Sequence, residues 1–106
     1  MSGTPLPDLI LYGRAECGLC DEARELLRAL LEERREKALP TPTLRVVDIE
    51  SDPALERALF AAIPVVELGD RRLEAVTSLA KLRRLFSEVL DGDVAARPGP
   101  KTAPIA

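Results

Sequence analysis

The chain has 106 residues, 46% of them apolar, and a formal net charge of −3, which predicts one domain with a modest core. The acidic balance argues against nucleic acid as a partner, and no apolar run reaches the eighteen or so residues of a membrane span. The first residues lack the charged and apolar regions of a secretory leader, so we expect a cytoplasmic protein that does not bind membranes.

The first predicted strand covers residues 8–12, because residues 9–11 form the continuous apolar run typical of a strand covered on both faces. We expect this strand to lie in the centre of its sheet. A long helix is predicted from Cys20 to about Lys37. Its apolar stripe recurs every three or four residues and consists of Ala23, Leu26, Leu27, Leu30 and Leu31.

The second half of the chain predicts three more strands and two more helices. The strands cover residues 44–49, 63–68 and 71–75, and the last two form a hairpin through Gly69-Asp70. The strand–helix–strand order at the start predicts a parallel crossover. A short helix opens at Ser51-Asp52-Pro53, and a last helix opens at Thr77 or Ser78 and stops at Asp91-Gly92. Tyr12 and Phe60 are expected to fill the core, and Arg71 and Arg72 to be solvated or to steer an acidic partner.

Three segments follow from this pattern. Residues 8–92 are expected to form the folded domain, preceded by a flexible start at residues 1–7. Residues 93–106 have no periodicity and are rich in proline and glycine, which predicts a disordered tail.

Cys17 and Cys20 are the only cysteines, and they stand where the first strand meets the first helix. At this spacing they can form a disulfide or lie side by side as a dithiol. The start of a helix favours the thiolate form of Cys17, so the pair predicts redox chemistry. The alternatives are a zinc site, which would need ligands that one chain lacks, a structural disulfide closing a very short loop, and two unreactive core thiols.

The order βαβαββα, with CxxC before the first helix and Ile63-Pro64 before the third strand, resembles the thioredoxin superfamily at its glutaredoxin-like size. The segment from Leu11 to Cys20 looks most like glutaredoxin-like proteins. This resemblance implies an α/β fold with a four-stranded mixed sheet flanked by helices. It also implies a cis Ile63-Pro64 bond facing the cysteines, with the N–H and C=O of Ile63 free to pair with an extended substrate.

The resemblance further implies a thiol–disulfide oxidoreductase in which Cys17 is the nucleophile and Cys20 the resolving cysteine. Arg14, Gly18, Leu19, Ile63 and Pro64 are the expected substrate-binding residues. The substrate would be a protein disulfide or a glutathione mixed disulfide. Glutathione or an enzyme like thioredoxin reductase would then return the protein to its dithiol form. We expect a monomer without a metal or cofactor, apart from glutathione as a co-substrate.

Two other functions stay open at this point. The first is an Fe–S cluster-binding protein of the glutaredoxin type, in which the nucleophilic cysteine and glutathione hold a cluster between two subunits. The second is a binding module on a thioredoxin-like scaffold whose cysteines have no catalytic role.

Overall fold

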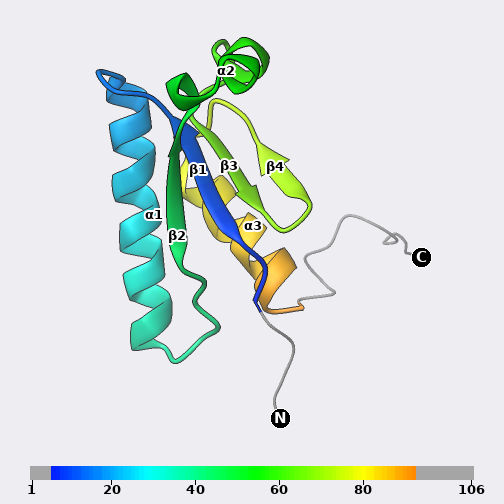
Figure 1. Cartoon of the computed structure of the whole chain (residues 1–106). Helices are drawn as coiled ribbons and strands as arrows, with labels where there is room; N and C mark the ends of the chain where they lie inside the picture. The colour runs from blue at the N-terminus through cyan, green and yellow to red at the C-terminus, as the bar shows by residue number, and fades with distance from the viewer. Residues whose placement is uncertain (1–5, 93–106) are drawn as a thin grey trace, which may run out of the picture.

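Figure 1 shows the computed structural model, which describes residues 6–92. The elements are β1 Leu9–Gly13, α1 Gly18–Glu36, β2 Leu44–Asp48, the 3₁₀ turn η1 Ile49–Ser51, α2 Pro53–Leu59, β3 Val65–Leu68, β4 Arg71–Leu73 and α3 Leu79–Leu90. This is the predicted order βαβαββα. Of the flexible start expected over residues 1–7, residues 1–5 lie outside the described residues, and so does the disordered tail expected over residues 93–106.

The sheet has the strand order β2-β1-β3-β4, so β1 lies inside it as predicted. β1 pairs in parallel with β2 and antiparallel with β3, and β3 pairs antiparallel with β4. The turn between β3 and β4 needs Gly69, whose φ of +63° lies in the left-handed region that glycine adopts without steric cost. The mixed four-stranded sheet and its hairpin are therefore confirmed.

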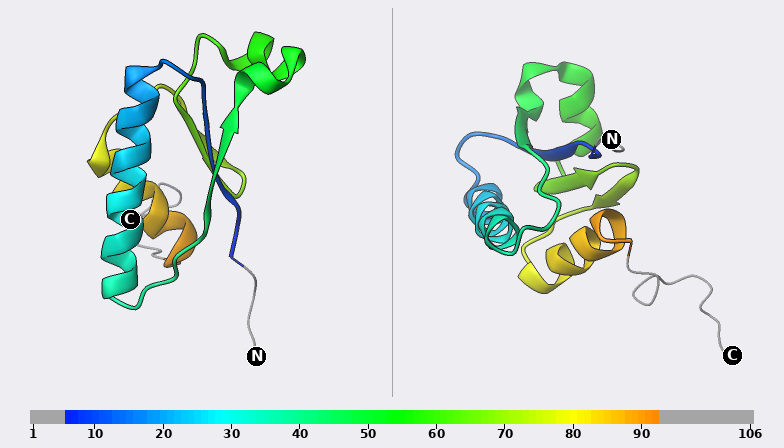
Figure 2. Two further views of the ribbon diagram at one scale, coloured as in Figure 1. Left: turned by 60° about the vertical axis from the view of Figure 1, so that its left-hand side comes forward. Right: turned by 90° about the horizontal axis from the view of Figure 1, so that it is seen from below.

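Helices cover the two faces of the sheet unequally (Figure 2). α1 and α3 pack on one face, where Leu9 and Leu11 of β1 join the larger core around the fully buried Phe86. Side chains alternate along a strand, so Tyr12 points to the other face and packs with Val65 against η1 and α2. The larger core therefore fixes α1, the helix that carries the cysteines, against the sheet.

The short helix α2 corrects one prediction from the sequence. Asp52 caps it by accepting a hydrogen bond from the Ala54 N–H at 2.9 Å. Leu59 at its end is buried, but Phe60, expected in the core, is 65% exposed. Successive residues of a helix point about 100° apart, so Leu59 and Phe60 cannot both face the sheet.

The strand predicted over residues 44–49 ends one residue early. The Asp48 carboxylate accepts a hydrogen bond from the Glu50 N–H at 2.9 Å, which starts η1 and turns Ile49 into the smaller core. Within residues 6–92, no helix has the length and apolarity needed to cross a membrane.

Candidate functional site

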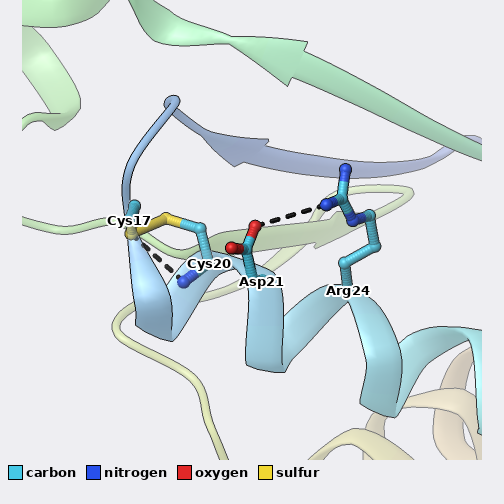
Figure 3. Close-up of a disulfide and its surroundings, with 4 residues drawn as sticks. All are labelled: Cys17, Cys20, Asp21 and Arg24. Atoms are coloured by element: carbon cyan, nitrogen blue, oxygen red, sulfur yellow. Dashed lines mark hydrogen bonds and ion pairs between the residues drawn. A yellow bond between two sulfur atoms is a disulfide. The ribbon is translucent and has the colours of Figure 1, made fainter.

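Cys17 and Cys20 form a disulfide at the junction of β1 and α1 (Figure 3). Their Cα atoms are 5.2 Å apart, a usual separation for a disulfide. Cys17 is the N-cap residue of α1, and its Sγ accepts a hydrogen bond from the backbone N–H of Cys20 at 3.1 Å. A sulfur atom thus satisfies one of the N–H groups that a helix leaves unpaired at its start.

The two sulfurs differ in access. Cys17 is half-buried, whereas Cys20 is only 5% exposed. Cys20 lies against Gly13, where an added Cβ would stand 3.0 Å from the Cys20 Cβ and 3.1 Å from its Sγ. The residues between the cysteines face solvent, with Leu19 56% exposed and open space beside the Gly18 Cα. A partner molecule therefore reaches Cys17 before Cys20.

Pro64 lies at the same end of the sheet as the disulfide. Tyr12 pairs with Val65, which places Pro64 beside the end of β1. The Ile63-Pro64 bond is cis, Pro64 is buried, and its carbonyl accepts a hydrogen bond from the Val76 N–H at 3.1 Å. The segment before α3 is thereby attached to the start of β3.

The expectation that the Ile63 N–H is free is wrong. This N–H donates to the Leu59 carbonyl at 3.2 Å, because the helical hydrogen-bond pattern continues past the end of α2. The Ile63 carbonyl accepts no hydrogen bond from any residue between 6 and 92. An extended partner could therefore pair with the C=O of Ile63 but not with its N–H.

A cavity of about 210 Å³ lies between α1 and the ends of β1 and β2, and Cys20 forms part of its wall. Asp21 and Arg24 also line it and form an ion pair of 3.2 Å on the same side of α1 (Figure 3). The Arg24 Nε atom is buried without a hydrogen-bond partner in the described part of the chain. Polar groups therefore lie behind the less accessible sulfur, and they were not among the residues predicted for the site. The only signal was the i, i+3 charge pair next to Cys20.

Arg14 lines a second, open hollow of about 610 Å³ together with residues of η1, α2 and the position after it. Those residues are Glu50, Glu56, Arg57 and Phe60. Neither Arg14 nor Arg57 forms an ion pair with a residue between 6 and 92. The sequence predicted Arg14 as a binding residue and missed Arg57, because no local pattern connects the loop before Cys17 with α2.

Tyr12 is not part of the site, although it lies next to Gly13 at the end of β1. Its hydroxyl donates to Glu67 Oε1 at 3.1 Å, and Arg72 donates to the other oxygen of Glu67 at 2.6 Å. Burial, and then the hydrogen bond to the Glu67 carboxylate, raise the pKa of Tyr12. The expected packing role of Tyr12 agrees with its place in the smaller core.

The part of the chain that the structure describes has no group of three or more Cys, His, Asp or Glu side chains placed to hold a metal ion.

Comparison with other proteins identifies the family. The family model described as "Glutaredoxin-like domain (DUF836)" matches residues 8–93. No curated protein matches the chain. Target protein XcR50 from X. campestris is 32% identical, with a TM-score of 0.60, and the match covers 76% of this chain and 96% of that one. Protein Ne2328 from Nitrosomonas europaea is 26% identical, with a TM-score of 0.52 and coverages of 70% and 80%. The family match spans the whole sheet, all three helices and the cysteine pair, so the chain belongs to the glutaredoxin-like domain (DUF836) family of the thioredoxin superfamily.

Proposed function

We propose that the protein is a thiol–disulfide oxidoreductase. The observation that carries this proposal is a disulfide at the start of α1 whose two cysteines differ in solvent exposure. Cys17 is half-buried, and Cys20 is buried. The family match and the cysteine pair together support a thiol redox role. The order of attack proposed here follows from the difference in access and from the helix start, where unpaired N–H groups and the helix dipole favour a thiolate on Cys17.

The reaction starts from the dithiol. The Cys17 thiolate attacks one sulfur of the substrate disulfide and forms a mixed disulfide with it, while the substrate S–S bond breaks and the other substrate sulfur leaves as a thiolate that takes a proton from water. Cys20 then gives its proton to water and attacks the Cys17 sulfur, which breaks the mixed disulfide and releases the attacked substrate sulfur as a thiolate that is protonated in turn. Two electrons have passed to the substrate, and the protein holds the Cys17–Cys20 disulfide. An external thiol such as glutathione, or a reductase, restores the dithiol.

The hollow beside Arg14 supports a peptide-like substrate. Arg14 and Arg57 supply guanidinium groups with no ion pair within residues 6–92, while Glu50 and Glu56 supply carboxylates. Glutathione carries two carboxylates and one ammonium group, so its charges complement this mixed lining. Phe60, exposed in the same hollow, adds apolar contact area. We therefore favour a glutathione mixed disulfide as substrate, with Gly18, Leu19 and the Ile63 carbonyl as further contacts. Pro64, expected to bind substrate, is buried and would act only by fixing the position of the Ile63 carbonyl.

The decisive experiment compares two single-cysteine variants on a small glutathione mixed disulfide and on insulin. We expect Cys17→Ser to lose all turnover. Cys20→Ser should form a stable mixed disulfide with one glutathione per chain, visible by mass spectrometry and removed by excess thiol. Activity in Cys17→Ser, or the absence of any adduct on Cys20→Ser, would contradict the proposed order of attack. Visible absorbance in protein purified without oxygen would instead favour the cluster-binding alternative.

The binding part of the proposal has its own test. Arg14→Gln and Arg57→Gln should each raise KM for the glutathione mixed disulfide about tenfold, the usual cost of one lost charged hydrogen bond. Turnover of an uncharged small disulfide should stay unchanged. The control is Arg28→Gln, because Arg28 is an exposed residue on α1 that lines neither this hollow nor the cavity behind Cys20.

A further inference from the structure

A third hollow, of about 340 Å³, lies between β4 and α3 and shares no lining residue with the cavity behind Cys20 or the hollow beside Arg14. In the right-hand view of Figure 2, α3 runs along the sheet below β3 and β4. This hollow is called here the β4–α3 groove. The residues that line it are Arg71, Leu73, Ala80, Lys81, Arg84, Leu85 and Glu88. Three cations face one carboxylate, which is an excess of positive charge in a chain whose net charge is −3.

Arg71, one of these three cations, is held in place by the buried Glu88. Glu88 has a side chain only 4% exposed, and its Oε1 accepts a hydrogen bond from Arg71 Nη2 at 3.0 Å. A buried carboxylate is costly unless it is paired, so this contact fixes the Arg71 guanidinium at the groove. The Arg71 side chain stays 43% exposed. Since a guanidinium has five N–H donors, most of them remain available to a ligand.

The other two cations are not explained by the stability of the fold. Lys81 and Arg84 lie three residues apart on α3, and neither forms an ion pair with a residue in the described range 6–92. Like charges at this spacing repel. Lys81 also lies in the first turn of α3, where the helix dipole disfavours a cation, and that turn has no acidic residue. A bound anion would relieve each of these unfavourable terms.

We propose that the β4–α3 groove binds a small organic anion, with its carboxylate or phosphate between Arg71, Lys81 and Arg84. The apolar part of the ligand would lie on Leu73, Ala80 and Leu85, which complete the lining. Small-molecule sites usually combine a mostly apolar lining with a few charged or polar groups. This site is independent of the redox proposal, because it shares no lining residue with the cavity behind Cys20 or the hollow beside Arg14.

The test uses the full, oxidised chain and two probes, phenyl phosphate and phenylacetate, at constant ionic strength set with sodium chloride. Backbone amide shifts in NMR spectra should change in a saturable way at β4 and the first half of α3. If only one of the two probes saturates, the site is supported and its anion is identified as phosphate or carboxylate. Saturation by both supports the shared anion chemistry.

A matched pair of variants decides whether the cations act together. The double variant Lys81→Gln with Arg84→Gln should weaken binding at least tenfold, and glutamine keeps the helix propensity of α3. Arg45→Gln on β2 removes another cation that has no ion pair within residues 6–92, and should leave binding unchanged. Three outcomes overturn the proposal: equal shifts with sodium chloride alone, shifts centred outside β4 and α3, or a double variant that binds like the parent.

Discussion

Arg34, near the end of α1, should be among the charged residues on which the stability of the domain depends most. Its side chain is 6% exposed, its Nε donates to the Pro40 carbonyl at 2.7 Å, and its two terminal nitrogens donate to the Asp91 carboxylate. The guanidinium carbon also lies 5.8 Å from the centroid of the Phe86 ring. These contacts tie the end of α1 to the end of α3, far from the cysteines.

The size of the effect follows from what Arg34→Ala leaves behind. Asp91 and the Pro40 carbonyl lose their donor, and removing one partner of a buried ion pair costs about 3–5 kcal/mol. The Asp91 side chain is 24% exposed, so water replaces part of the lost contact and we expect a value near the lower limit, about 3 kcal/mol. Such a loss lowers Tm by roughly 12–24 °C in a domain of this size.

Urea unfolding of the oxidised protein, followed by circular dichroism, measures this loss. The free energy of unfolding of Arg34→Lys should lie between those of the parent and of Arg34→Ala, because an ammonium cannot reproduce the bidentate contact to Asp91. The control, Arg28→Ala, removes an exposed arginine paired with Glu25 at 3.8 Å and should cost less than about 0.5 kcal/mol. α1 has 19 residues and is about 28 Å long, so folded Arg34→Ala should keep its disulfide chemistry. A loss below about 1 kcal/mol for Arg34→Ala would refute the reasoning.

Two further predictions concern Tyr12 and Gly13, the last two residues of β1. The chain has one tyrosine and no tryptophan, so absorbance at high pH reports on Tyr12 alone, and its midpoint should lie above 10.0 because burial and Glu67 raise the pKa. The folded state then holds this proton more tightly than the unfolded state, so stability from Tyr12 is complete below pH 10.0 and falls as the pH rises through the folded pKa. Glu67→Gln should lower the midpoint, and an unchanged midpoint would show that Glu67 has no part in the shift. Gly13→Ala should destabilise the oxidised protein by about 1–3 kcal/mol, because the new Cβ presses on Cys20, whereas Gly18→Ala has open space and should not. Equal unfolding midpoints for these two variants would contradict the packing argument.

Much of the fold could be predicted because its signals are local. An apolar run at residues 9–11, a stripe of leucines along α1 and the Gly69-Asp70 turn each specify an element within a few neighbouring residues. The order of these elements then restricts the sheet to few arrangements, since the first strand–helix–strand unit predicts a parallel crossover, as β1 and β2 show. The position of Cys17 at the start of α1 follows in the same way, because it stands directly before the helical pattern.

What the sequence by itself determined is therefore the order of the elements and the place of the cysteine pair between a strand and a helix. Only the tertiary structure decided that Phe60 faces solvent and that the Ile63 N–H already donates to the Leu59 carbonyl. Only the tertiary structure, likewise, brings Arg14 and Arg57 into one hollow and Arg71 and Lys81 into another. Periodicity describes each element alone, whereas access and charge clustering depend on how separate elements pack, which no local pattern records.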